Sequence, residues 1–147
     1  MKTFEELKED LLERAKKHNA CQDGYRMVLN AKSKHDLLKA ITNNWYWVLS
    51  ASKMIEANYL ENNFSEEELA EAGIYTRKEH TSNAKSFACG SATVEAYDSA
   101  TVEAYDNSYV EDCTGNINTV SDRGIVKDYY NHKIYIKKGK FEIIEIE

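Results

Sequence analysis

Proline is absent from all 147 positions of this sequence, and glycine occurs only six times. Chain reversals must therefore depend on Asn, Asp, Ser and the few glycines, which are the other residues that suit tight turns. No apolar run approaches the ~20 residues that a membrane-spanning helix needs, and no signal-peptide pattern is present. We therefore expect a soluble, cytoplasmic protein without a membrane partner.

Cysteine is also scarce, with Cys21, Cys89 and Cys113 as its three positions. These form neither a Cys-x-x-Cys pair nor an even-numbered disulfide framework, so we expect free thiols in a reducing compartment. The four histidines show no metal-ligand spacing, and no phosphate-binding glycine loop, zinc-protease or nucleophile-elbow motif is present. The sequence therefore predicts no enzyme, cofactor or metal site, although a catalytic triad assembled from distant residues would leave no such spacing.

Positive charge is missing from one long stretch. Between Ser86 and Asp122 there is no Lys or Arg, whereas seven acidic residues occur there. Because binding to a phosphate backbone relies on Lys and Arg displacing counterions, this stretch disfavours direct contact with nucleic acid. The acidic residues are Glu95, Asp98, Glu103, Asp106, Glu111, Asp112 and Asp122.

The first 80 residues have the pattern of a helical region. Thr3 and Glu6 form a capping-box pair ahead of apolar residues at helical spacing. The cluster Trp45-Tyr46-Trp47 allows two interpretations, since exposed aromatic residues anchor interfaces, but Trp45 continues an apolar helical stripe and is favoured for the core. Helices are predicted from residue 4 to about 17, over 25–30, from Ser33 with a break at Asn43-Asn44, and from Ser65 to a C-cap at Gly73.

A tandem octapeptide is the most informative feature, because Ser91–Asp98 is repeated identically as Ser99–Asp106. The period of eight continues with changed letters through NSYVEDCT, GNINTVSD and RGIVKDYY, ending at Tyr130. Within SATVEAYD the residues at even positions, Ala, Val and Ala, alternate with Thr, Glu and Tyr, as in a strand with one buried face. We expect the small residues to point inward, Thr, Glu and Tyr to point outward, and Asp-Ser to form a tight turn.

Short strands of this kind cannot bury their apolar face alone, so they stack into the coils of a parallel β-solenoid. The predicted fold class is α+β, with a helical head over 1–80 capping a solenoid over 81–130. A C-terminal strand or hairpin over 131–147 is predicted to cover the other end, with Lys133–Ile136 and Lys140–Ile146 flanking Lys137-Lys138-Gly139.

Either two or three octads could complete one coil. With three, Cys89 and Cys113 would stack on neighbouring rungs about 4.8 Å apart. With two, these cysteines would lie on opposite faces. The sequence leaves both arrangements open.

The octad AYDSATVE resembles the AGYGSTLT-type unit of bacterial ice nucleation proteins, in which two octads make a coil. Ice binding would need a long array of threonines, and here Thr93 and Thr101 are its only clear members. The whole plan, with Asn19-Ala20-Cys21, a Trp-rich helical stretch and ATVEAYD octads, is similar to octapeptide-repeat proteins of gut-bacterial phages and mobile elements. That resemblance implies an origin, and no activity is attached to it.

Tyrosines are interleaved with the acidic residues of the repeat. Stacked Glu and Asp side chains would project a negative field able to steer a basic protein partner. The predicted partner-binding residues are Glu95, Tyr97, Asp98, Glu103, Tyr105, Asp106, Tyr109, Glu111 and Asp112.

Two functions of different classes are compatible with these features. In the first, a phage or mobile-element inhibitor mimics nucleic acid and occupies the binding surface of a basic host defence protein, in the manner of anti-CRISPR proteins. In the second, the chain is a structural or oligomerisation scaffold that dimerises through its C-terminal strands. The acidic residues would then only keep a repetitive β surface soluble and unpaired.

Overall fold

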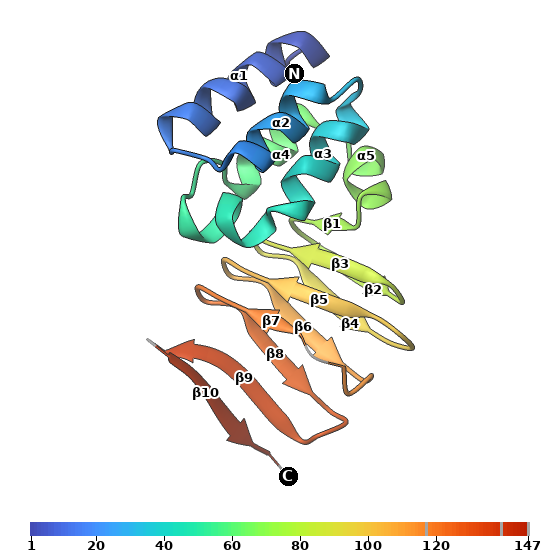
Figure 1. Cartoon of the computed structure of the whole chain (residues 1–147). Helices are drawn as coiled ribbons and strands as arrows, with labels where there is room; N and C mark the ends of the chain where they lie inside the picture. The colour runs from blue at the N-terminus through green and yellow to red at the C-terminus, as the bar shows by residue number, and fades with distance from the viewer. Residues whose placement is uncertain (117, 139, 147) are drawn as a thin grey trace. The chain divides into compact units, whose positions relative to one another are not determined.

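The computed structural model describes residues 1–116, 118–138 and 140–146. The chain forms two compact units, Met1–Ala72 and Gly73–Glu147. Helices make up the first unit and strands make up the second (Figure 1), which confirms the predicted α+β class. The second unit begins before residue 80, because two short strands at Ile74–Tyr75 and Glu79–Ser82 already belong to it.

The helical unit begins each of its outer helices with a predicted capping box. The Thr3 hydroxyl accepts a hydrogen bond from Glu6 N at 3.2 Å, and the Glu6 carboxylate accepts one from Thr3 N at 2.9 Å. Ser65 and Glu68 form the same reciprocal pair. No helix of the described residues is long and apolar enough to span a bilayer. The helices are α1 (Phe4–Lys17), α2 (Gln22–Asn30), α3 (Lys34–Asn43), the π-helix η1 (Trp47–Ala51), α4 (Ala57–Asn63) and α5 (Glu66–Glu71).

Three details of the helical unit bear on the sequence-based predictions. Helix α2 begins at Gln22 rather than Tyr25, because the Cys21 sulfur caps it by accepting a hydrogen bond from Gly24 N at 3.4 Å. Trp45 is 1% exposed, which confirms core packing. The predicted break follows α3, whereas α4 was not predicted, and its N-terminus has no side-chain cap that could have announced it.

The second unit is a parallel β-solenoid of about three turns. Successive strands alternate between a four-stranded sheet, β1-β3-β5-β7, and a six-stranded sheet, β2-β4-β6-β8-β9-β10. The strands are β1 (Ile74–Tyr75), β2 (Glu79–Ser82), β3 (Lys85–Ala88), β4 (Thr93–Ala96), β5 (Thr101–Ala104), β6 (Tyr109–Asp112), β7 (Thr119–Val120), β8 (Ile125–Asp128), β9 (Lys133–Lys138) and β10 (Lys140–Glu145).

Two octads complete one coil. Thr93 in β4 pairs with Tyr109 in β6, and Tyr109 pairs with Ile125 in β8, so each step along the sheet advances 16 residues. Cys89 therefore follows a strand of one sheet and Cys113 follows a strand of the other, as expected for two octads. Cys89 is buried and Cys113 is exposed.

The solenoid core consists of the small residues that the alternation placed inward. Ala and Val side chains at the even octad positions form one buried cluster. The turns are also as predicted, because Asp98, Asp106 and Asp122 have positive φ values of 53°, 55° and 55°. Asp tolerates this left-handed conformation better than most residues, which explains how the chain turns without proline and with little glycine.

The predicted C-terminal hairpin is confirmed. Strand β9 pairs antiparallel with both β8 and β10. Tyr135 packs against the solenoid core, and Lys137 Nζ donates to Ser121 Oγ at 3.3 Å. Since Ser121 follows β7, strand β9 contacts both sheets and covers the last coil. Gly139, expected in the hairpin turn, lies outside the described residues.

Candidate protein-binding face

The two-octad coil divides the predicted acidic site between two sheets. Glu95 in β4 and Glu111 in β6 are direct neighbours in the six-stranded sheet. Glu103 lies in β5 of the four-stranded sheet. The three glutamates therefore do not form one stack, and the prediction of a single acidic ladder through all three is wrong. The reason is geometric, because successive octads face opposite sides of the solenoid.

Glu95 and Glu111 line a shallow groove on the outer face of the six-stranded sheet. Neighbouring strands in a sheet are about 4.8 Å apart, so like-charged neighbours repel each other. Among the described residues neither glutamate makes an ion pair. The groove has a volume of about 330 Å³ and is lined by Glu79, His80, Thr81, Thr93, Glu95 and Glu111.

Neighbouring groups respond to this negative charge. Burial and then the nearby carboxylates, Glu95 first, raise the pKa of the Cys113 thiol. Burial, followed by the Glu111 carboxylate, raises the pKa of the Tyr109 phenol. The field ends at Lys127, which pairs with Glu111 in the sheet and has its ammonium 4.7 Å from the ring centroid of Tyr129.

Glu103 has different surroundings. The Lys85 ammonium lies 3.8 Å from its carboxylate, and the Tyr105 hydroxyl lies 3.4 Å from it. Part of its charge is therefore compensated within the solenoid. Glu103 contributes nothing to the groove around Glu95.

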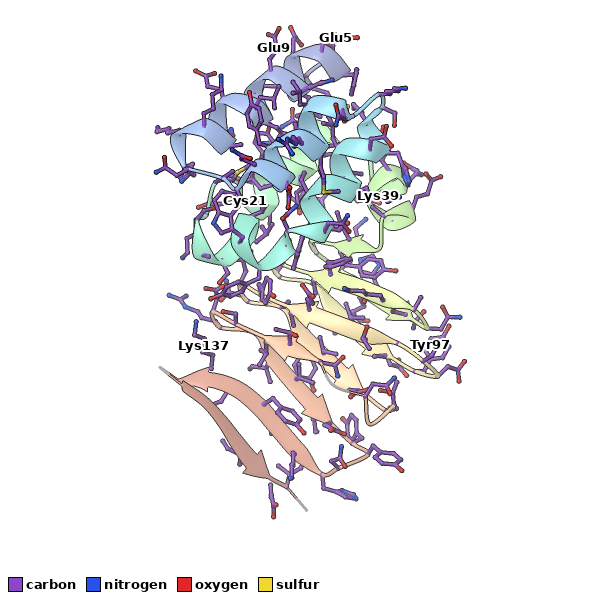
Figure 2. The ribbon with its side chains drawn as sticks, viewed as in Figure 1. Glu5, Glu9, Cys21, Lys39, Tyr97 and Lys137 are labelled. Atoms are coloured by element: carbon purple, nitrogen blue, oxygen red, sulfur yellow. The ribbon has the colours of Figure 1, made fainter. Side chains whose placement is uncertain are left out.

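The two repeat tyrosines also differ. Tyr97 is 40% exposed and projects from the turn after β4 (Figure 2). Tyr105 is 1% exposed, so its predicted outward position is wrong. Its neighbours along the coil axis, Cys89 and Ser121, are buried too, whereas Cys113 beside Tyr97 is exposed. The four-stranded sheet therefore has a closed corner where the six-stranded sheet has an open one.

Asp112 is fully buried, which overturns its assignment to a partner-binding surface. It takes the inward position that Ala96 has on the preceding coil. Its Oδ1 accepts hydrogen bonds from Thr114 N at 2.8 Å and Thr114 Oγ1 at 2.6 Å, and its Oδ2 accepts one from Asn118 Nδ2 at 2.8 Å. Asp112 therefore satisfies the polar groups of the irregular turn between β6 and β7.

The two turn aspartates differ in a similar way. Asp106 Oδ2 accepts a hydrogen bond from Gly90 N at 3.0 Å, so this carboxylate holds two successive coils together. Asp98 is exposed. Of the nine predicted residues, the six-stranded sheet and its turns bring together Glu95, Tyr97, Asp98, Tyr109 and Glu111.

Residues of β2 were missed by the sequence-based prediction. Glu79 and Thr81 line the groove, although the octad pattern is not recognisable in Glu79–Ser82. β2 pairs with β4 after a step of 14 residues, from Glu79 to Thr93, rather than 16. The shorter first coil hides β2 from a search at period eight.

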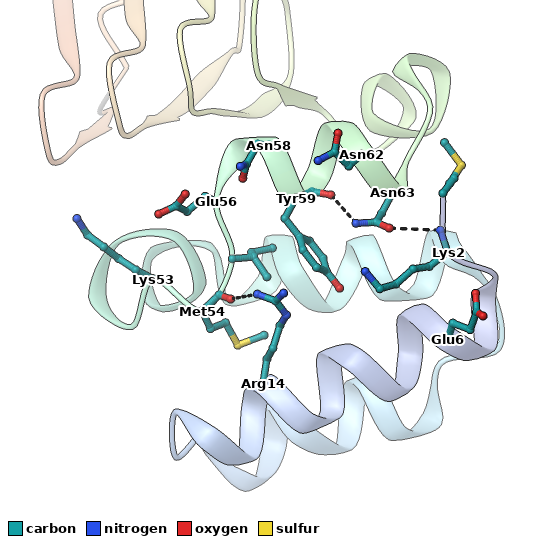
Figure 3. Close-up of a pocket in the computed structure, with 12 residues that line it drawn as sticks. Lys2, Glu6, Arg14, Lys53, Met54, Glu56, Asn58, Tyr59, Asn62 and Asn63 are labelled. Carbon is teal, nitrogen blue, oxygen red and sulfur yellow. Dashed lines mark hydrogen bonds between the residues drawn. The ribbon is translucent and has the colours of Figure 1, made fainter.

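The helical unit has a polar cavity of about 690 Å³ (Figure 3). On its wall, Asp10 Oδ2 accepts hydrogen bonds from Tyr59 OH at 2.5 Å and Arg14 Nε at 2.9 Å. Arg14 Nη1 also donates to Met54 O at 2.9 Å. Burial acts to raise the pKa of Asp10, but the hydrogen bonds from Tyr59 and Arg14 lower it overall. Burial and Asp10 raise the pKa of Tyr59. These groups stabilise one another and contain no nucleophile beside a base.

No family model, curated protein or solved structure matches this chain. Within the described ranges, no three His, Cys, Asp or Glu side chains gather in a cluster that could hold a metal ion. The functional argument therefore rests on the surface of the solenoid.

Proposed function

We propose that this chain is a non-enzymatic protein-binding module that uses its acidic groove to bind a basic protein. The acidic groove is the outer face of β2, β4 and β6 around Glu79, Glu95 and Glu111, with Tyr97 and Tyr109 at its margin. The observation that carries the proposal is the direct pairing of Glu95 with Glu111, two carboxylates without an ion pair among the described residues. Like charges in register destabilise a sheet, so a partner that supplies Lys or Arg would relieve a cost that the free protein bears.

The resemblance to proteins of phages and mobile elements suggests the kind of partner. A basic surface that normally binds nucleic acid is complementary to a groove of this charge. We therefore propose an inhibitor that occupies the nucleic-acid-binding surface of a host defence protein, in the manner of anti-CRISPR proteins. The exposed Tyr97 beside the groove would supply the aromatic contact that such interfaces favour.

The identical octapeptides provide a matched pair of variants for the test. Glu95→Lys and Glu103→Lys make the same substitution in the same eight-residue context and change the net charge equally. Only Glu95 lines the acidic groove. Each protein would be immobilised and exposed to a nuclease-treated bacterial lysate at low and high salt, with thermal unfolding as the control for folding.

We expect the wild type and Glu103→Lys to capture the same basic nucleic-acid-binding protein at low salt, and Glu95→Lys to lose it. The purified partner should then bind the wild type more weakly as salt rises, because charge pairs between exposed groups are screened. Equal capture by both variants would exclude the acidic groove as the binding site.

A scaffold is the second candidate, and strand β10 supports it. In the described part of the chain β10 pairs only with β9, so its other edge is open to another strand. Ile144 in this strand is 44% exposed. If β10 joins two copies, the wild type should sediment as a dimer and Ile144→Lys as a monomer. A monomeric wild type at about 100 µM would reject the scaffold, since binding weaker than this is marginal.

A further inference from the structure

A second cavity lies within the helical unit, among α1, α2, α3 and η1. Its volume is about 230 Å³, and its walls are mainly apolar, with Leu11, Val28, Ile41, Val48 and Met54 among them. An apolar cavity of roughly 150 Å³ is large enough to bind benzene. This cavity could therefore hold a somewhat larger ring system.

Gly24 opens one wall of the cavity at a cost to helix α2. Glycine is among the poorest residues for a helix interior. A Cβ atom at this position would be 3.5 Å from Asn44 Oδ1 and 3.5 Å from Cys21 Sγ, which are ordinary contacts. Gly24 is not among the residues with positive φ. Folding therefore does not require glycine here, and its effect is to leave space beside Asn44.

The π-helix η1 forms another wall through Trp47 and Val48. Its last turn is held by Ser52, whose N and Oγ each donate to Trp47 O at 2.8 Å. π-helices are rare and occur frequently at functional sites. Trp47 lies off the apolar stripe that continues through the buried Trp45, so its place beside the cavity was not a requirement of the helical pattern.

Asn44 supplies a hydrogen-bond acceptor to the cavity wall. Its Nδ2 donates to Ala40 O at 2.8 Å, which orients the side chain. Within the described ranges its Oδ1 accepts no hydrogen bond. Departures from the ordinary rules of helix formation are expected mainly at functional or strained sites. Here a helical glycine, a π-helix and a polar side chain surround the same apolar cavity.

We infer that this cavity binds a small planar aromatic molecule that carries one N–H or O–H donor. The Trp47 ring and the Met54 thioether favour contact with an aromatic ring. The ligand's donor would pair with Asn44 Oδ1. This site lies in the helical unit and is independent of the acidic groove.

Indole is the probe for the test, titrated into the full chain and followed by the NMR shifts of the alanine, valine and isoleucine methyl groups. Gly24→Ala adds one methyl group beside Asn44. Thr42→Ala, in the neighbouring helix α3 and outside the cavity wall, is the control. Both changes favour helix formation, so both variants should melt at or above the wild-type temperature and neither should fail to fold.

We expect saturable shifts at the methyl groups that line the cavity. Indole should bind Gly24→Ala about tenfold more weakly and Thr42→Ala as tightly as the wild type. N-methylindole, which lacks the donor, should also bind about tenfold more weakly, as the loss of one buried hydrogen bond predicts. The absence of saturable shifts in the wild type, or undiminished binding by Gly24→Ala, would overturn the site. Equal binding of indole and N-methylindole would overturn the role of Asn44.

Discussion

Two identical octapeptides, Ser91–Asp98 and Ser99–Asp106, form the same strand and turn in different surroundings. The seventh residue is 40% exposed in the first copy, as Tyr97, and 1% exposed in the second, as Tyr105. The difference arises because two octads complete a coil, so successive copies belong to opposite sheets. A repeat sequence therefore determines strand and turn, while the coil period and the flanking coils determine which copies are buried.

The largest expected effect separates the two tyrosines. Tyr105→Ala should lower the free energy of unfolding of the solenoid by about 3 to 5 kcal/mol, because it removes a large buried aromatic side chain. Tyr97→Ala should cost less than about 1 kcal/mol, as is usual for exposed positions. Urea unfolding followed by circular dichroism measures both. Equal losses in the two variants would contradict the closed and open corners.

The third octad, NSYVEDCT, sharpens the comparison because it has Asp112 where the first two copies have alanine. Asp112→Ala should cost about 1 to 3 kcal/mol, since Thr114 N and the Asn118 amide would lose their buried acceptor. Glu111→Ala, one residue earlier on the outer face, is the control and should change stability by less than about 0.5 kcal/mol. A neutral Asp112→Ala would mean that water replaces the carboxylate in this turn.

Much of this fold could be predicted because local chemistry determines it. Thr3 and Ser65 mark helix starts through hydrogen bonds to residues three positions later. The alternation within SATVEAYD reflects the two-residue period of a strand, and Asp98 fits a left-handed turn. In each case the residues that interact are close in sequence, so the pattern is visible there.

The candidate site was predicted less well, because its surroundings come from residues far away in the sequence. Strand β5 ends at Ala104, so the inward and outward alternation no longer applies to Tyr105 in the following turn. Likewise, the spacing of Asp10 and Arg14 suggests an ion pair, but Tyr59 joins them from 49 positions away. Such contacts follow from the packing of whole elements, which one sequence does not show.

The smallest expected effect concerns the last residue of the two copies, and it isolates one hydrogen bond. Asp98 and Asp106 both adopt positive φ values, 53° and 55°, that glycine adopts more readily. Asp98→Gly should therefore change stability by less than about 0.5 kcal/mol, because the relief of backbone strain offsets the greater freedom of the unfolded chain. Asp106→Gly makes the same backbone change but removes the acceptor of the 3.0 Å hydrogen bond from Gly90 N. It should cost about 1 kcal/mol more than Asp98→Gly, measured as a shift of the urea midpoint at constant m value. Because the seven preceding residues are identical, this difference reports the bond between two coils and not the propensity of the turn. If the two variants unfold at the same urea concentration, the carboxylate of Asp106 contributes nothing to the stacking of the coils.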